Sequence, residues 1–475
     1  MICAGPRLSA KAGMRGVGLL KGGLVCGALC ALAGLAQAQL KTGPDIAADD
    51  SLTWKGITLY GVVDIGLQYE VHGAPFNDYH PAGSANIVQK NSNHSELGLT
   101  PSNMGQSRVG LQGVEPLTGD WSAIFKVETF FNPQSGQISD ASKSMVQNNG
   151  RSLATQTTNL NSSVAGQLLQ TAYVGFSSRT FGTLTFGRQL TLVADGITKY
   201  DPNYSSQAFS LIGMSGPYAG AGDTEDKRLD SSAKYLVSFA DLFHFGALYK
   251  FNGAYGSSNT AAQVDFGADY AGLSADAYYS QVFSAISSAP LSAAQVAGLP
   301  ALGYSVSNSL AGTISDNLAY ALMSSYKMDP FKFFLSWEHI RFRNPANPLP
   351  AGFNDIGGYV LAYVNNNAYV NDKVYNVYWT GVRYTARPHL DLTVAYYTVR
   401  QNSYGTGASA GCSSKAFATC SGILQAYSFD ADYILTKRFD VYAGVMYSGV
   451  RNGLANGYIF HTNNLNPTVG VRFKF

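Results

Sequence analysis

The chain has 475 residues, of which 13% are charged and 12% are aromatic, and its formal net charge is +2. Soluble domains are typically about 25% charged, so this composition argues against an ordinary soluble protein. The nearly neutral balance lacks the basic signature of a protein that binds nucleic acid. Only one long apolar segment is present, near the N-terminus. A helical membrane protein would show several such segments.

The N-terminus, residues 1–38, has the layout of a secretory signal peptide. Residues 22–36 are apolar and uncharged, and Ala36-Gln37-Ala38 supplies a cleavage site. This apolar run is shorter than the roughly 20 residues that a membrane-spanning helix needs. We therefore expect cleavage after Ala38, with Met14 as an alternative start of translation. Cleavage would leave 28 basic against 30 acidic residues, because four of the 32 basic residues lie in the signal.

Cysteine usage agrees with export. Three of the five cysteines fall in the predicted signal, which leaves Cys412 and Cys420 in a stretch rich in glycine and serine. Two close cysteines in an exported protein predict a disulfide that closes a loop. A metal-binding pair is the weaker alternative because no histidine lies beside them. No metal and no cofactor are expected.

Apolar and polar residues alternate with a period of two along much of the chain. At the C-terminus Val471, Phe473 and Phe475 alternate with Arg472 and Lys474. Similar alternation recurs around residues 264–270, 390–396 and 427–435. Strands of about ten residues with one apolar face are typical of a transmembrane antiparallel β-barrel, in which that face meets lipid. Residues 375–385 show no simple alternation, so either a bulge lies there or the strand register is assigned wrongly.

The segments between the predicted strands alternate between short and long. The short turns are 115–120, 177–182, 329–331, 387–389 and 436–439. The long polar connections are 70–106, 132–167, 190–226, 284–316, 343–372 and 401–422. Tight turns at one end and long loops at the other are the layout of outer-membrane barrels. This spacing predicts an all-β fold of about 16 strands that occupies residues 39–475.

Four segments, taken in order, resemble the general-diffusion trimeric porins of Gram-negative outer membranes. These segments are 57–64, then 107–113 with 121–128, then 172–176 with 181–189, and finally 469–475. The resemblance implies a sixteen-stranded barrel whose long third loop folds into the lumen. It also implies a homotrimer in outer-membrane lipid and lipopolysaccharide, folded by the barrel-assembly machinery through an aromatic C-terminal signal, here Phe475. The implied function is a water-filled channel for passive diffusion of small hydrophilic solutes and ions.

The resemblance also implies which residues narrow the pore, where charges on the wall and on the third loop create a transverse field. The basic wall would comprise Arg108, Arg188, Arg228 and Lys234. The acidic side, on loop three, would comprise Asp201, Asp223, Glu225 and Asp226. Further residues expected to face the lumen are Tyr60, Asp64, Lys126 and Glu128.

Side chains alternate between the two faces of a strand, and this alternation (strand parity) tests two of these assignments. Arg108 alternates with Val109 and Leu111, so it faces the lumen if they face lipid. Arg188 falls in step with the lipid-facing Phe186. Only a bulge at the strand end would turn Arg188 inward. A lumenal charge can also be merely solvated, and this reading is favoured for any single acid of loop three.

Other functions remain as alternatives. Val62 and Gln170 stand where such porins often carry basic residues. A substrate-specific channel is therefore the main alternative to a general one. A barrel enzyme or an adhesin is less favoured. The chain has neither a Gly-x-Ser-x-Gly nor a His-Glu-x-x-His motif, and such motifs would position the catalytic groups of common hydrolases. We therefore expect a channel and not an enzyme.

Overall fold

The structure is a computed structural model. The described residues are 52–73, 76, 88, 93–139, 168–212, 228–290, 297–303, 310–348, 355–356, 359–360, 363–407, 410–412, 419–455, 458 and 460–475. The chain divides into two units, Met1–Asp50 and Ser51–Phe475, and all described residues belong to the second unit. The predicted signal peptide, residues 1–38, lies outside the described residues, and so do Asp223, Glu225 and Asp226.

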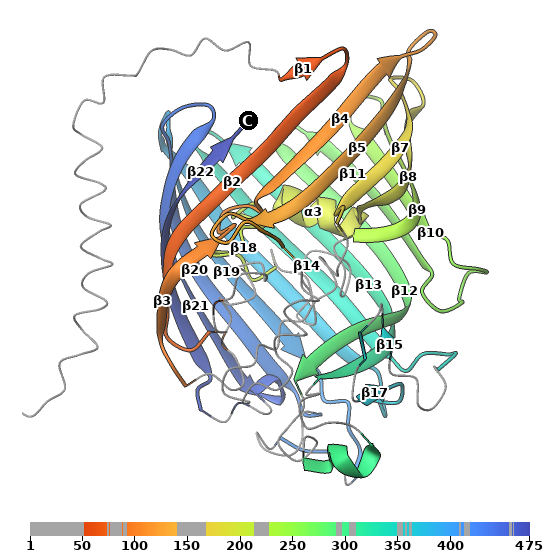
Figure 1. Ribbon diagram of the computed structural model, residues 1–475, viewed down its shortest axis with the longest axis vertical. Helices are drawn as coiled ribbons and strands as arrows, with labels where there is room; N and C mark the ends of the chain where they lie inside the picture. Colours follow the sequence, from red (N-terminus) through yellow and green to blue (C-terminus); the bar gives the residue numbers. More distant parts are fainter. Residues whose placement is uncertain are drawn as a thin grey trace, which may run out of the picture. The chain divides into compact units, whose positions relative to one another are not determined.

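Sixteen antiparallel strand positions of the described chain form a closed barrel (Figure 1). Its strands are β2 (Ile57–Glu70), β4 (Arg108–Pro116), β5 (Trp121–Asn132), β7 (Thr171–Ser178), β8 (Gly182–Leu190), β9 (Arg228–Phe239), β10 (Phe243–Lys250), β11 (Ala261–Tyr270), β12 (Leu273–Pro290), β13 (Leu310–Met328), β14 (Phe331–Arg343), β18 (Lys373–Arg387), β19 (Leu390–Gln401), β20 (Gly422–Ile434), β21 (Phe439–Asn452) and β22 (Asn463–Lys474). β3 (Glu96–Pro101) shares one position with β4, because both pair with β2. β22 pairs with β2 and closes the barrel. The predicted fold class is confirmed.

Several short elements lie outside these sixteen positions. They are β1 (Thr53–Trp54), β6 (Gln137–Ile138), β15 (Asp355–Ile356), β16 (Tyr359–Val360), β17 (Tyr363–Asn365), α3 (Leu192–Tyr200) and the 3-10 turns η3 (Leu299–Leu302) and η5 (Gly453–Ala455). No helix among the described residues is long and apolar enough to span a bilayer.

The alternation of side chains sets the two faces of the wall. Outward positions carry exposed apolar side chains such as Leu97, Leu335 and Val394. Inward positions include fully buried polar residues such as Asn466 and Thr468. This distribution is the reverse of that in a soluble protein, and it suits a wall whose outside meets lipid. Closure leaves no strand edge to expose backbone groups to the bilayer.

Connections are short at one end of the barrel and long at the other, as predicted. β11 and β12 are joined by Ala271 and Gly272 alone, with φ values of 47° and 85°. Two positive φ values are typical of the tight hairpin turn that matches strand twist, and glycine adopts this conformation without steric cost. The irregularity expected within residues 375–385 is not found, because both pairings of β18 keep their register there, and a shift occurs only beyond that range, between Thr385 and Arg387.

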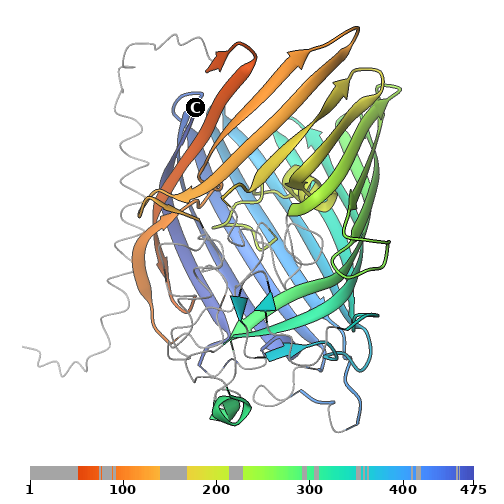
Figure 2. The same cartoon turned by 45° about the vertical axis from the view of Figure 1, so that its right-hand side comes forward.

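The third long connection begins with α3, which lies inside the ring of strands (Figures 1 and 2). Thr191 caps this helix, since its Oγ1 accepts a hydrogen bond of 3.1 Å from the Ala194 amide. The helix buries Leu192 and Ile197. These side chains pack in a cluster with inward residues of β10 to β14 and of β18 to β21. The loop therefore lies against that part of the inner wall.

Candidate functional site

Glu128 is the centre of a charged cluster on the inner wall. Its side chain is only 5% exposed, and it lies 3.4 Å from Nε of Arg108 and 3.8 Å from Nη2 of Arg228. Lys126 approaches the same carboxylate to 3.8 Å. The Tyr60 hydroxyl donates a hydrogen bond of 3.0 Å to it. Three basic groups around one acidic group leave this cluster with a net charge of +2.

The order of the strands brings these residues together although they are far apart in sequence. β4 and β5 are neighbours, and Arg108 stands opposite Phe130. The guanidinium of Arg228, at the start of β9, lies 4.6 Å from the centre of the Phe130 ring. Its Nε is 3.4 Å from Thr171 Oγ1, which also contacts Glu128 at 3.5 Å. This cation–π contact and the hydrogen bonds hold Arg228 against β5 and β7.

Lys234 contacts loop three directly. Its Nζ forms an ion pair with Asp195 of α3 and donates a hydrogen bond of 3.0 Å to the Leu190 carbonyl. A cavity of about 230 Å³ is lined by these residues together with Lys126 and Glu128 of the wall. The structure therefore connects the Glu128 cluster to the start of loop three through this cavity. Lys234 contributes a neutralised pair and not a free positive charge.

Asp201 does not line the pore, and this corrects the prediction. Its side chain is fully buried. The Tyr397 hydroxyl donates a hydrogen bond of 2.7 Å to its Oδ1, and the Ser205 amide donates one of 2.7 Å to its Oδ2. Burial raises the pKa of the Asp201 carboxyl above its ordinary value. Asp201 instead fixes loop three to β19.

Arg188 also departs from its predicted place. The register between β8 and β9 does shift between Gly187 and Gln189, but the extra residue lies on β9, and Gln189 faces inward in step with Thr185, where it hydrogen-bonds with Ser232 at 3.2 Å. Arg188 pairs across the strands with Ala172. Side chains of cross-strand partners point to the same face of the sheet. On β7 the residues that face inward are Thr171 and Tyr173, so Ala172 between them points to the other face, and so does Arg188. Arg188 is therefore not directed toward the Glu128 cluster.

Asp64 is on the lumen side as predicted, but it is fully buried. Its Oδ2 accepts hydrogen bonds from the amides of Met104, at 2.8 Å, and Gly105, at 2.9 Å. Its Oδ1 accepts one of 2.5 Å from the Tyr442 hydroxyl. Asp64 thus holds the segment between β3 and β4 against β21, and it has no contact with open water.

Comparisons with known proteins agree with this architecture. A sequence model of the Gram-negative porin family matches residues 26–453. The chain belongs to the Gram-negative porin family. Porins of this family lie in the outer membrane, and family and fold indicate a channel rather than an enzyme. An outer membrane porin of Bordetella pertussis is 26% identical over 216 residues, which cover 44% of this chain and 46% of that porin. The match therefore spans about half of the relative's length.

Solved structures show the same fold. The anion-selective porin from Comamonas acidovorans has a TM-score of 0.54 at 17% identity, covering 88% of this porin and 99% of that chain. OmpT of Vibrio cholerae, expressed in the outer membrane, has a TM-score of 0.54 at 16% identity, with coverages of 90% and 100%. The channel DcaP of Acinetobacter baumannii has a TM-score of 0.50 at 16% identity, with coverages of 89% and 99%.

The sequence did not predict several of the contacts that hold loop three against the wall of this porin. Lys199 of α3 lies 3.2 Å from Asp276 and 3.5 Å from Asp269. The guanidinium of Arg383, on β18, donates to the Pro202 carbonyl and lies 3.3 Å from the centre of the Tyr204 ring. The sequence did show charged residues at inward positions of these strands. It could not show which residue of loop three each of them contacts.

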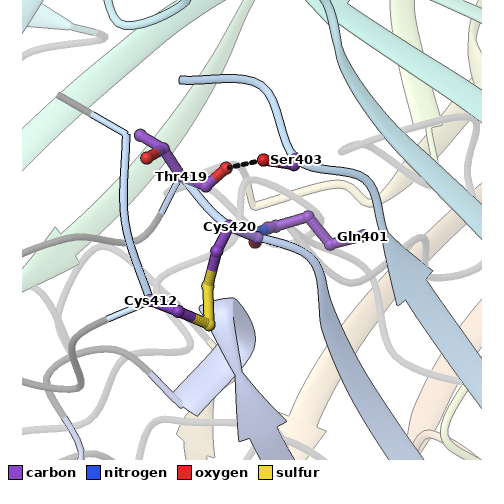
Figure 3. Close-up of a disulfide and its surroundings, with 5 residues drawn as sticks. All are labelled: Gln401, Ser403, Cys412, Thr419 and Cys420. Carbon is purple, nitrogen blue, oxygen red and sulfur yellow. Dashed lines mark hydrogen bonds between the residues drawn. A yellow bond between two sulfur atoms is a disulfide. The ribbon is translucent and has the colours of Figure 1, made fainter. Parts of the chain in front are cut away.

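Cys412 and Cys420 form a disulfide in the connection between β19 and β20 (Figure 3). Their Cα atoms are 5.0 Å apart. The Gln401 side chain, at the end of β19, donates a hydrogen bond of 2.8 Å to the Cys420 carbonyl. The disulfide-closed segment is therefore tied to the long-loop end of the barrel wall.

Phe475 completes the closing seam of the porin barrel. Its amide donates to the Gly61 carbonyl at 3.1 Å, and its carbonyl accepts from the Gly61 amide at 2.9 Å. A Cβ on Gly61 would lie 2.3 Å from the Phe475 ring, so glycine leaves the space that the ring fills. The last residue thus contributes both hydrogen bonds and packing where β22 meets β2.

Proposed function

We propose that this porin forms a water-filled channel for passive diffusion of small hydrophilic solutes and ions. The observation that carries the proposal is the cluster of Arg108, Lys126 and Arg228 around Glu128 on the inner wall. Charged side chains are stable there only if water or other charges solvate them. Loop three lies inside the barrel and would narrow the water-filled space beside this cluster.

The charges of the cluster favour anions over cations. A net charge of +2 in a narrow passage with low-dielectric walls attracts anions and repels cations. Asp223, Glu225 and Asp226 would form the acidic side of the same constriction. The transverse field between the two sides would favour charged and dipolar solutes over apolar ones.

The proposal extends to assembly. The porin would act as a homotrimer, surrounded by lipid and lipopolysaccharide and inserted by the barrel-assembly machinery. One of the Vibrio cholerae OmpT structures is described as a trimer form. Enzymatic activity and a cofactor form no part of the proposed function.

Electrophysiology combined with solute uptake tests this function. Purified porin in planar bilayers should give stepwise conductances, and in liposomes it should admit small sugars and amino acids at rates that fall with solute size. Uptake that saturates for one solute while size-matched solutes are excluded would support a substrate-specific channel instead. An absence of conductance from correctly folded protein would refute both versions.

A further inference from the structure

We propose that Glu70 and Glu96 form a binding site for a divalent cation such as Ca²⁺ at the seam where the barrel closes. The two residues are direct cross-strand partners on β2 and β3. The Cβ atoms of such partners lie about 4.5–5.5 Å apart, so the two carboxylates share one site. No sequence motif marks this pair, because its members are separated by a long loop.

Glu70 is a buried carboxylate without a compensating donor among the described residues. It is only 1% exposed, and neither carboxylate oxygen has a hydrogen-bond partner in the part of the chain that the structure describes. The ionisable group that acts on it there is a second carboxylate, that of Glu96. An isolated ionised carboxylate is strongly disfavoured in such surroundings. A bound cation would satisfy both carboxylates at once.

Neutral oxygen donors lie on the adjacent strand. Thr468 of β22 stands opposite Gln68 of β2, and continuing this register places Asn466 opposite Glu70. Asn466 and Thr468 are both fully buried. The Oδ1 of the first and the Oγ1 of the second have no hydrogen-bond partner among the described residues. Carboxylate, amide and hydroxyl oxygens are the donors that Ca²⁺ and Mg²⁺ prefer over nitrogen or sulfur.

Described residues of the connection between β2 and β3 contact this site. The Phe76 amide donates a hydrogen bond of 3.1 Å to Glu96 Oε2. The Phe76 ring lies over Gly98, where a Cβ would be only 2.9 Å away. Asn464 Oδ1, on β22, accepts hydrogen bonds from the His72 amide at 2.8 Å and the Val71 amide at 3.0 Å. A cation held by Glu70 and Glu96 would therefore clamp this connection and the β2–β22 seam together.

Thermal unfolding of the folded porin in detergent, after removal of metal with EDTA, tests this site. Titration with Ca²⁺ should raise the unfolding midpoint in a saturable manner, because a ligand that binds only the folded state stabilises it. Glu70→Gln and Glu96→Gln should each abolish the rise. Glu115→Gln, which changes an exposed carboxylate at the short-turn end, should retain it. Sodium chloride at matched ionic strength should not reproduce the effect.

Equilibrium dialysis with radioactive Ca²⁺ measures the same site without relying on the variants. Wild-type porin should bind one EDTA-removable ion per chain, and Mg²⁺ should compete for it. Either an unchanged midpoint in wild type or an equal response in Glu70→Gln would overturn the proposal. Failure to bind the ion in dialysis would do the same, and would mean that Glu70 stays protonated.

Discussion

Replacing Arg108 with serine should shift the ion preference of the channel toward cations. Arg108, Lys126, Arg228 and Glu128 together carry +2, and the substitution leaves +1. The Arg108 side chain is 35% exposed, whereas that of Arg228 is 6% exposed. Permeating ions therefore meet Arg108 more directly. Its charge is permanent near neutral pH, so titration does not complicate the effect.

The size of the shift follows from Coulomb's law. An ion that passes about 8 Å from the guanidinium interacts with it by about 0.5 kcal/mol at the dielectric constant of water. Screening over about 8 Å at physiological salt reduces this to about 0.2 kcal/mol. Anions and cations are affected with opposite sign, so their permeability ratio should change by about 0.4 kcal/mol, or about twofold. At about 0.01 M salt the weaker screening predicts about fourfold.

The reversal potential of single channels in a potassium chloride gradient measures this ratio. Glu128→Gln should move the reversal potential in the opposite direction, since it raises the charge of the cluster to +3 from +2. Arg179→Ser removes an exposed arginine in the turn between β7 and β8 and should change little. The reasoning is refuted if Arg108→Ser leaves the reversal potential unchanged at both salt concentrations. An equal shift in Arg179→Ser would refute it as well.

Three further predictions concern Phe475, the disulfide and Asp201. Deleting Phe475 removes two backbone hydrogen bonds and a packed ring at the seam, so the yield of heat-modifiable folded barrel on gels should fall. Thiol titration of the unreduced mature protein should find Cys412 and Cys420 blocked, and their disulfide should stabilise the loop by roughly 2–3 kcal/mol. Asp201→Ala leaves the buried Tyr397 hydroxyl without its acceptor. The resulting loss of roughly 1–3 kcal/mol should loosen loop three and increase single-channel noise.

The strands could be predicted from the sequence because lipid imposes a simple rule on the outer face. The alternation of Val471 and Phe473 with Arg472 is the pattern that β22 follows. The inward direction of Arg108 likewise followed from its alternation with Val109 and Leu111, which were expected to face lipid. Parity needs only an intact register, so it was reliable inside regular strands.

The hypothesis that a bulge turns Arg188 inward was wrong, whereas parity had placed Arg188 in step with the outward Phe186. The extra residue lies on β9, so β8 keeps its alternation through Arg188, and a bulge cannot be located from composition alone. Asp201 lies in a loop, where spacing gives no information on direction. Its burial depends on Tyr397, which is distant in sequence and approaches only because loop three folds inward.

The strand that lacked alternation points to the path of the solutes. Tyr375, Val377 and Trp379 of β18 face inward and are almost completely buried. The Trp379 indole donates a hydrogen bond of 3.1 Å to the Tyr200 carbonyl of loop three. This part of the wall is apolar on both faces because a loop, and not water, covers its inside.

Apolar buried side chains also occur at inward positions of β13, β19 and β21, such as Ala321, Val399 and Met446. Charged inward residues occur on many strands, including Asp276 on β12 and Arg383 on β18, but Arg108 and Lys126 beside Glu128 keep partly exposed side chains. Loop three packs against the apolar cluster of the wall and is also held by charged wall residues, namely Lys234, Asp276 and Arg383. Among the basic side chains around Glu128, that of Arg108 is the most exposed, which is why its replacement should have the clearest effect on the ion preference.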